Sequence, residues 1–564
     1  MKRAILPNFS SSSFLLFVVL ISSTAAQQHD LNYTLNSVFE GNAVIFRVDL
    51  KFKSDAQRMT KLMLPSAWDG QEQLYNSIKN LRAISSDTQI ADTAEPNIKS
   101  ITHNANQTLH IQYDVVQDWA GSEIKDGLFN RAILQKNYFY LIGNSFLVYP
   151  ESDEEKQVFF RLQWQNIPKT WALANSFGIS KRQQSFKTSI EELRKGIYLG
   201  GDFRLKPVPV NGKPIYVATR GVWKFADEEF NSLVGKVMRV ERSFWNDNDF
   251  SYFLVLLFPT DDSNSSGESR TNSFVIYASR NAEKPSAFKY HLAHELFHDW
   301  NPKRLGGIES ESLYWFSEGF TDYYTSLLLL RAGLITSDDY VADYNSVLKN
   351  YYTSPFRNHS NKQILIDRLS NYDAQRQPYQ RGNLLAHNWN AQIRAVTGGK
   401  YSLDDVMRDL FKSASRNGFR LSNTTINHAI RHYLKEDILQ DIERYIENGA
   451  TISPHKDIIA SCLQMKIVDF APFDAGFDIE ATYPKKIFVG VKEGSNAYRA
   501  GMRNGQKWVK GGIERDPNVL AEFVVEESGI RKTIKFYPAG DKIAVPQFDQ
   551  SPGKSITNLC SNFQ

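Results

Sequence analysis

Residues 291–304, which read HLAHELFHDWNPKR, contain two histidines and a glutamate in a pattern that can bind a metal: His294, Glu295 and His298. His294 and His298 are four residues apart, so on a helix both imidazoles would lie on one face and reach a single ion. A catalytic zinc has three protein ligands and one open position for water. Glu295 follows the first histidine, where its carboxylate can take a proton from such a water. The pattern predicts a hydrolytic zinc site; the alternative is a surface helix without a metal.

A third ligand is expected from residues 313–333, which are dense in apolar and aromatic side chains. This composition predicts a buried helix that ends at Gly333. A carboxylate inside such a helix is costly unless it is paired or bound to a metal. Glu318 and Asp322 are four residues apart and share a face. We assign Glu318 as the third ligand and Asp322 as the acceptor for the second N–H of a ligand histidine. Two ordinary carboxylates on the wet side of an amphipathic helix are the alternative.

The two segments HELFHDWNPKR and WFSEGFTDYY, with nineteen residues between His298 and Glu318, resemble the glycyl aminopeptidase family of zinc peptidases. The continuation Trp300, Asn301, Lys303, Arg304 is a more specific mark of that family than the histidine pair. The resemblance covers residues 195–440. It implies one zinc ion as cofactor and a thermolysin-like α+β catalytic domain, often followed by a PDZ-like domain.

The resemblance also implies two further functional residues. In the aminopeptidase relatives, a tyrosine in a P-Y-x-[K/R]-G setting hydrogen-bonds the oxyanion of the tetrahedral intermediate, and Tyr379 stands in that setting. Such a donor can lower the barrier by about 2.7–4 kcal/mol; a packing tyrosine is the alternative. The family usually has a Gly-rich segment with a glutamate near the substrate amine. Glu268 is the candidate, in a predicted polar loop (residues 261–270) whose sequence differs from that segment, and a solvated loop carboxylate is the alternative.

The elements around these residues can be predicted from their patterns. A helix over residues 226–245 and strands over residues 252–258 and 273–277 precede the zinc helix. In enzymes with this order, the strand before the metal helix lies along the cleft and can pair with an extended peptide. Helices follow over residues 339–352, 375–397, 402–415 and 425–448. His428 and His432 are also four residues apart, but Arg431 would place a cation beside any ion, so we predict a solvated helix face there.

The chain begins with the pattern of a secretory signal peptide. Lys2 and Arg3 form a basic start, residues 14–21 are an apolar run, and residues 22–26 offer small side chains for cleavage. That run is too short to span a bilayer, which takes about 20 residues, and no later run approaches this length. We expect residues 1–26 to be removed, and the mature protein to be exported to the periplasm or the medium without a membrane span.

The fold class predicted for the whole chain is multidomain α/β. Alternating apolar and polar residues predict a β-rich N-terminal domain over residues 27–195. The zinc peptidase domain would cover residues 196–450. Residues 451–564 resemble a PDZ-like β domain, in which residues 497–501 match the short helix and its turn. Cys462 and Cys560 flank this region, and a single disulfide and two free thiols both remain open.

The charge composition of the chain indicates which classes of partner are expected. The net charge is only +4, with 66 Lys and Arg dispersed among 62 Asp and Glu, so nucleic acid is not an expected partner. We interpret the chain as an exported zinc-dependent peptidase that acts on peptides, with an aminopeptidase activity implied by the resemblance. An endopeptidase with the same core, an epoxide hydrolase of the leukotriene-hydrolase type, and a non-catalytic peptide-binding or chaperone protein with a relic metal site are the alternatives.

Overall fold

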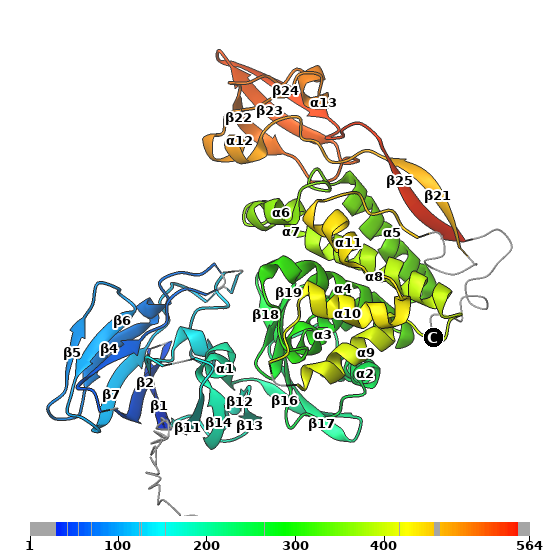
Figure 1. Cartoon of the computed structure of the whole chain (residues 1–564). Coiled ribbons are helices and arrows are strands. Elements are labelled where there is room, and N and C mark those ends of the chain that lie inside the picture. The colour runs from blue at the N-terminus through cyan, green and yellow to red at the C-terminus, as the bar shows by residue number, and fades with distance from the viewer. Residues whose placement is uncertain are drawn as a thin grey trace, which may run out of the picture. The chain divides into compact units, whose positions relative to one another are not determined.

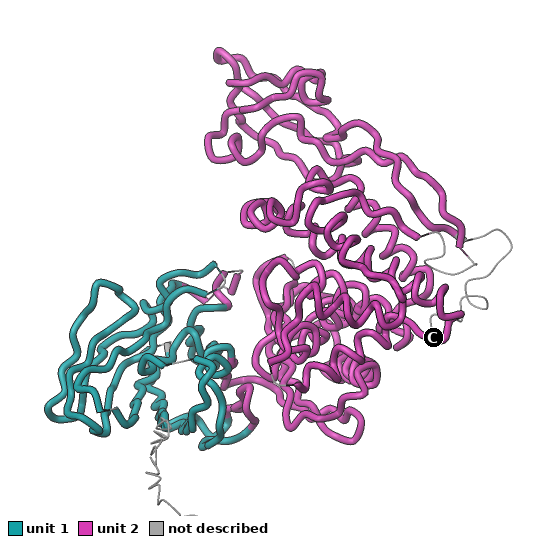
Figure 2. Tube along the Cα trace, in the orientation of Figure 1, with its two compact units in different colours: residues 1–120, 130–170, 180–195 teal, residues 121–129, 171–179, 196–564 magenta. Residues whose placement is uncertain are grey.

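The computed structural model describes residues 30–455 and 463–550, apart from positions 42, 55, 69, 123, 126, 153, 264 and 417. The predicted signal peptide, Cys462 and Cys560 lie outside the described residues. The chain divides into two compact units (Figure 2). Unit 1 comprises residues 1–120, 130–170 and 180–195, and unit 2 comprises residues 121–129, 171–179 and 196–564. Within the described residues, no helix is both long and apolar enough to cross a membrane.

Unit 1 is built almost entirely of strands, as its alternating sequence predicts (Figure 1). A six-stranded sheet has the order β14-β11-β1-β2-β7-β4, with β1 and β11 parallel. In β11, every second side chain from Val158 to Trp164 is buried, which is the pattern of a strand with one face on a core. The bounds are β1 Asp30–Glu40, β2 Ala43–Lys53, β4 Ile78–Ala83, β7 Thr108–Val115, β11 Gln157–Gln165 and β14 Gln183–Ser189.

A second sheet of unit 1 has the order β10-β3-β6-β5. Its strands are β3 Met59–Met63, β5 Gln89–Asp92, β6 Ile98–Thr102 and β10 Tyr149–Pro150. Unit 1 also contains β8 Ile133–Gln135, β9 Tyr138–Ile142 and α1 Ile190–Lys195. The prediction of a β-rich N-terminal region is confirmed.

Unit 2 contains a five-stranded sheet of order β16-β17-β18-β20-β19. Strands β18 and β20 are parallel and buried along their whole length, as expected for strands covered on both faces. The sheet is made of β16 Arg204–Val210, β17 Lys213–Thr219, β18 Leu254–Thr260, β19 Ser266–Arg270 and β20 Ser273–Ser279. A separate antiparallel group consists of β12 Ala172–Asn175, β13 Gly178–Ile179 and β15 Ile197–Gly201.

Two predictions about this sheet are wrong. Residues 266–270, which were expected in a polar loop, form β19 and pair antiparallel with β20. Strand β20, which directly precedes the zinc helix, lies between β18 and β19, so both of its edges are already paired. The edge strand next to that helix is therefore β19, and an extended peptide would pair with β19 rather than with β20.

Helices make up most of the rest of unit 2 (Figure 1). Their bounds are α2 Asp227–Trp245, α3 Lys289–Phe297, α4 Tyr314–Arg331, α5 Ser337–Thr353, α6 Asn361–Asp367, α7 Tyr372–Gln375, α8 Gln377–Val396, α9 Leu403–Ala414, α10 Asn423–Leu434 and α11 Leu439–Asp441. The helix predicted over residues 375–397 is interrupted at Arg376, because Pro378 lies in the first turn of α8 and disfavours continuation from α7. The helix predicted over residues 425–448 breaks at Lys435, whose φ is +65°.

The C-terminal part of unit 2 has its own small core. A three-stranded sheet of β22 Lys507–Gly512, β23 Ala521–Glu527 and β24 Ile530–Phe536 packs with the short helices α12 Ile479–Lys485 and α13 Asn496–Arg499. Phe477, Phe488 and Phe523 lie at the centre of this core. A two-stranded ribbon of β21 Leu463–Phe470 and β25 Ile543–Gln550 runs along α5. Asn345 of α5 anchors it with two hydrogen bonds of 2.8 Å to the backbone of Phe548.

Candidate metal centre

His294 of α3 and His298, which directly follows the last residue of that helix and keeps helical φ and ψ, lie on one face because they are four residues apart. The opposite face packs into the core of unit 2 through Leu292 and Leu296, which are fully buried. The helix ends just before His298, and an irregular segment, Asp299–Arg304, follows it. Helix α4 supplies Glu318 and Asp322 from one of its faces. The two helices pack against each other and bring these side chains together.

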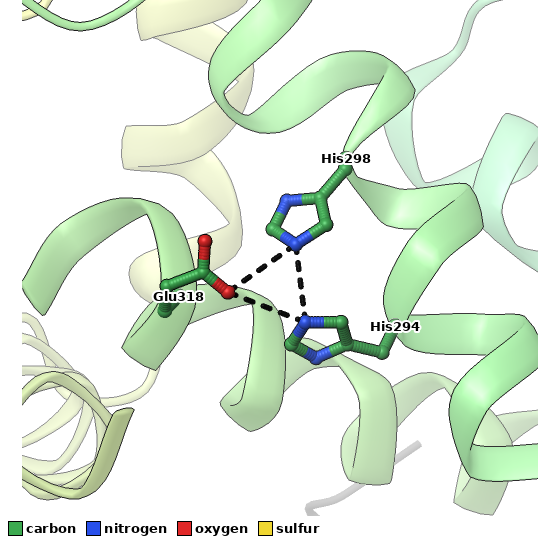
Figure 3. Close-up of side chains that lie close together, drawn as sticks. All are labelled: His294, His298 and Glu318. Carbon is green, nitrogen blue, oxygen red and sulfur yellow. Dashed lines mark hydrogen bonds and ion pairs between the residues drawn. The ribbon is translucent and has the colours of Figure 1, made fainter. Parts of the chain in front are cut away.

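Three atoms that could bind a metal converge between α3 and α4 (Figure 3). Nε2 of His294 lies 3.0 Å from Nε2 of His298, and Oε2 of Glu318 lies 3.4 Å from each of them. Ligand atoms about 2.0–2.2 Å from a tetrahedral zinc are about 3.3–3.6 Å apart. The two 3.4 Å distances to Glu318 lie in this range, and the 3.0 Å distance between the two histidine nitrogens is about 0.3 Å shorter, so a small outward movement of the rings would let all three atoms bind one zinc ion.

The second nitrogen of each imidazole fixes its protonation. Nδ1 of His294 lies 2.8 Å from Oδ1 of Asp322, and Nδ1 of His298 lies 2.8 Å from the carbonyl oxygen of Asn301. Both partners accept hydrogen bonds, so in each neutral ring Nδ1 carries the proton and Nε2 presents a lone pair. Two lone pairs at 3.0 Å repel each other unless a cation lies between them. This donor set, with its outer acceptors, suits a divalent metal.

Sequence reasoning did not identify Asn301 as an acceptor for His298. Asn301 leaves helical geometry, with φ −108° and ψ 104°, and its side-chain amide donates to the carbonyl of Ser317 in α4 at 3.2 Å. Its neighbours in the WNPKR segment bind Asp247: Trp300 Nε1 donates to that carboxylate at 2.8 Å, and Arg304 forms an ion pair with it. In the sequence, the WNPKR segment indicated the family resemblance. In the structure, its contacts with Asp247 and Ser317 fix the chain directly after α3.

Glu295 lies between α3 and the edge strand β19. A Cβ placed on Gly267 of β19 would come within 3.3 Å of Cγ of Glu295, so the strand backbone passes directly beside this side chain. Burial raises the pKa of Glu295; the imidazoles of His298 and His294 oppose this effect, and the charge of Glu318 adds to it. A carboxylate with a raised pKa is a better proton acceptor than an exposed one.

The other charges of the centre favour a cation. Burial raises the pKa of Glu318, but His298 and His294 outweigh that effect and hold the pKa well below its usual value. Burial lowers the pKa of His294, but the hydrogen bonds to Asp322 and Glu318 outweigh it and leave the pKa well above its usual value. The lowered pKa of Glu318 and the raised pKa of His294 both show that this centre stabilises positive charge between the histidines and the carboxylate.

Tyr379, at the start of α8, faces the same centre. Its ring lies parallel to that of His294, with 6.0 Å between the ring centroids. Burial raises the pKa of the Tyr379 phenol, and the charge of Glu318 adds to this, so the hydroxyl stays protonated at neutral pH and can donate. The guanidinium of Arg376 lies 4.0 Å from the Tyr379 ring centroid and 3.2 Å from Oδ2 of Asp322. Arg376, which sequence reasoning did not single out, therefore links the tyrosine to the carboxylate behind His294.

The remaining candidates from the sequence lie elsewhere. Glu268 is on β19, where its carboxylate pairs with Arg270 and accepts from the hydroxyl of Tyr277 at 3.3 Å. It is close enough for its charge to raise the pKa of Glu295. His428 and His432 lie exposed on α10, outside the metal-type group found among the described residues, as predicted.

A cavity of about 600 Å³ opens beside the centre. Its walls include His294, Glu295 and Tyr379, together with residues of α5 and of the α7–α8 junction. This volume is within the roughly 300–1,000 Å³ typical of ligand pockets. The cavity thus places a substrate-sized space next to a proton acceptor, a hydroxyl donor and a three-ligand metal group.

A solved structure shows a related fold. The aminopeptidase N family protein from Idiomarina loihiensis superimposes with a TM-score of 0.73 over 95% of this chain and 100% of its own, at 16% sequence identity. The M1 zinc metallopeptidase from Deinococcus radiodurans matches with a TM-score of 0.46 and 14% identity over 76% of this chain and 97% of its own. A comparison with curated proteins finds no significant match.

Two family patterns match the sequence itself. Residues 36–189 match the Peptidase M61 N-terminal domain, and residues 288–385 match M61 glycyl aminopeptidase. The second match spans the α3–α4 centre and the Tyr379 segment. The chain is therefore similar to the M61 glycyl aminopeptidase family in both its N-terminal and its catalytic domain.

Proposed function

We propose that the protein is an exported aminopeptidase that hydrolyses the N-terminal bond of peptides with a zinc-activated water. The observation that carries this proposal is the convergence of His294, His298 and Glu318 beside Glu295. These three residues would hold the metal. When bound, zinc acts as a Lewis acid that lowers the pKa of water and polarises a carbonyl.

The chain's own residues divide the remaining work. Glu295 accepts the proton of the attacking water and then donates it to the leaving amine. The hydroxyl of Tyr379 donates a hydrogen bond to the oxyanion of the tetrahedral intermediate. Asp322 holds the Nδ1 proton of His294 and so keeps the Nε2 lone pair directed into the centre. Edge strand β19 is available to pair with the extended substrate backbone.

The aminopeptidase assignment is supported by Glu268. Glu268 lies on β19 opposite Val275 of β20, and its negative charge raises the pKa of Glu295. A substrate whose backbone pairs with β19 would bring its α-amine close to Glu268, and an amine is the natural partner of a carboxylate there. Comparing free-amine with N-acetylated peptides tests this: an aminopeptidase leaves the blocked peptides intact, whereas efficient cleavage of blocked peptides identifies an endopeptidase.

Replacing Glu295 by Gln tests the proposed mechanism. The variant is expected to retain zinc, because Glu295 is not a ligand, and to lose at least about 1,000-fold in kcat, because an amide cannot accept the proton. Metal analysis and peptide digestion of the same preparation measure both quantities. Full turnover by the variant would refute the mechanism, and peptide binding that persists without any turnover in the wild type would favour a binding protein with a relic site.

Two further parts of the proposal concern the ends of the chain. Export rests on the signal-peptide pattern of residues 1–26, and N-terminal sequencing of the mature protein tests it.

A PDZ-like character of the C-terminal region is supported by its three-stranded sheet and by the short helix α13, which lies between Gly494 and Gly501. Gln506 is buried where the resemblance would lead one to expect an acidic residue.

A further inference from the structure

The catalytic cavity has walls from two parts of unit 2. Beside Glu295 and Tyr379, its lining includes Pro472, Phe473, Arg515 and Pro517 of the C-terminal β region. A cavity of about 600 Å³ holds more than the one residue next to a scissile bond. The parts of a peptide beyond that residue would therefore meet the C-terminal region.

The C-terminal wall is held by backbone hydrogen bonds and by the ribbon on α5. The carbonyl of Pro472 accepts from the N–H of Gly540 at 2.9 Å, and the N–H of Asp474 donates to the carbonyl of Pro538 at 2.9 Å. Arg515 belongs to the loop between β22 and β23, two strands of the same small core. The hydrogen bonds fix the Pro472–Asp474 segment of the wall, and the Arg515 loop is attached at both ends to paired strands of the small core.

Arg515 offers this cavity a cation with unused donors. Its Nη1 lies 3.6 Å from Oδ1 of Asp373, which is an ion-pair distance but too long for a hydrogen bond. Within the described part of the chain, no hydrogen bond of its side chain is found. Both side chains are about half exposed, at 49% and 43%, and an ion pair of that kind contributes little.

The other cations that line the cavity are already engaged. Arg376 contacts Asp322 and the Tyr379 ring, and the ammonium of Lys349 lies 5.3 Å from the ring centroid of Phe470. A guanidinium binds a carboxylate through two parallel N–H bonds, whereas an ammonium is a point charge. Arg515 is therefore the group of this wall that is best suited to a planar anion.

We propose that Arg515 is a specificity-determining residue that binds a carboxylate of the peptide substrate. That carboxylate is either the C-terminal one of a short peptide or an acidic side chain beyond the cleaved bond. The inference rests on the proposed peptidase function and deepens it. Binding by Arg515 would mean that the C-terminal region contributes to substrate selection. Short peptides or peptides with acidic side chains would then be the preferred substrates.

The test compares three peptides: a tripeptide of alanine as the free acid, the same tripeptide as its amide, and the amide with glutamate as the last residue. For the wild type, kcat/KM is expected to be about tenfold higher for at least one of the two peptides that carry a carboxylate than for the neutral amide. Arg515→Ala should remove this preference by raising KM for the peptides that carry a carboxylate. Arg515→Lys should retain part of it, since the charge remains but the fork is lost.

Asp373→Asn separates substrate binding from simple attachment of the C-terminal region. If Arg515 binds substrate, Asp373 competes for it, so this variant should keep or increase the preference, opposite to Arg515→Ala. If the pair only holds the C-terminal region in place, both variants should lower cleavage of all three peptides alike, and the inference is overturned. Arg531→Ala, which removes an exposed ion pair with Glu526 outside the cavity, is the matched control.

The outcomes distinguish the two levels of the proposal. A preference for the free acid identifies the terminal carboxylate, and a preference for the glutamate amide identifies an acidic side chain. Equal rates for all three peptides in the wild type overturn the role of Arg515 and leave the peptidase function intact. Failure of the zinc-loaded wild type to cleave any of them, or any other free-amine peptide, would overturn the peptidase function itself.

Discussion

Glu295 of α3 and Tyr379 of α8 line the same cavity and can act on the same substrate. Glu295 has the raised pKa of a buried proton acceptor, and Tyr379 has a hydroxyl that burial keeps protonated. Between them, the centre can both remove a proton and stabilise the negative charge that the attack creates. The ring of Tyr379 contacts both the His294 ring and the guanidinium of Arg376.

Replacing Tyr379 by Phe is expected to lower kcat by about 100- to 1,000-fold with little change in KM, because the lost hydrogen bond forms mainly in the transition state. Steady-state kinetics on a free-amine peptide measure this. Tyr372→Phe, a second tyrosine of the cavity wall, is the control and should remain within about twofold. A Tyr379→Phe variant as active as that control would show that the tyrosine only packs.

Residues within one short stretch were predictable because helical spacing alone decides what they share. The spacing of His294, Glu295 and His298 places the three side chains at one site. The four-residue spacing of Glu318 and Asp322 places both carboxylates on one face of the next helix. The carbonyl of Asn301 was not predictable, since a backbone acceptor has no residue type. Arg376 was missed because its contacts with Asp322 and Tyr379 join residues 54 positions and 3 positions away across a helix break.

At the scale of elements, the centre depends on a close crossing of α4 and α8. A Cβ on Gly382 would lie 1.7 Å from the carbonyl oxygen of Trp315, and one on Gly319 would lie 2.4 Å from Cα of Gly382. The helices therefore touch backbone to backbone, which only glycine permits. Since α4 carries Glu318 and α8 carries Tyr379, this crossing sets the distance between the metal group and the hydroxyl donor.

Gly382→Ala should force the two helices apart. We expect a loss of about 1–3 kcal/mol in the free energy of unfolding and about 100-fold in kcat, because a shift of about 1 Å misplaces the donor. Gly235→Ala in α2 is the matched control, since its new methyl group would meet only side-chain atoms of Val208 and Arg239. Equal behaviour of the two variants would mean that the crossing does not position the site.

Buried His387 of α8 makes the stability of the fold depend on pH. Its Nδ1 donates to the carbonyl of Asn383 at 2.9 Å, and its Nε2 lies 3.0 Å from the hydroxyl of Tyr340 in α5, so the neutral ring is satisfied. Burial lowers the pKa of His387 to about 4. The unfolded chain, with a pKa of about 6.5, therefore binds more protons between these values. Stability is complete above pH 6.5 and falls as the pH drops towards 4.

His387→Gln should remove this dependence. Between pH 7 and pH 5, the wild type is expected to lose about 2 kcal/mol more in the free energy of unfolding than the variant. Urea unfolding of both proteins at the two pH values measures the difference. His428→Gln, on the exposed face of α10, should behave as the wild type does. A wild type and a His387→Gln variant with equal losses would show that this histidine is not neutral in the fold.

Element-scale predictions from the sequence succeeded where a pattern is long and regular. The predicted helix over residues 226–245 and the buried helix before Gly333 match α2 and α4 closely, because their periodicity extends over several turns. Strand β19 was missed since SGESR has no apolar alternation, and it is a strand only because β20 offers it a partner. Tertiary pairing of this kind is absent from local sequence patterns.

At the scale of the whole molecule, all groups of the centre belong to unit 2. Metal removal should therefore loosen unit 2 and leave unit 1 unchanged, because a ligand stabilises only the part of a protein that binds it. With zinc at about a thousandfold excess over its Kd, the loss on chelation is about 4 kcal/mol. Hydrogen exchange read by mass spectrometry should show faster exchange in α3 and α4 after chelation and no change in β1, β2 and β7. Equal protection of α3 in both states would speak against a metal there.

The central claim is that His294 of α3, His298 at the C-terminal end of that helix and Glu318 of α4 bind one zinc ion. Diffraction data collected on both sides of the zinc absorption edge, from crystals of the protein purified with zinc, test it most directly. We predict a single anomalous peak about 2.0–2.2 Å from Nε2 of His294, Nε2 of His298 and a carboxylate oxygen of Glu318. No peak at that position, or a zinc ion bound by other residues, would contradict the account.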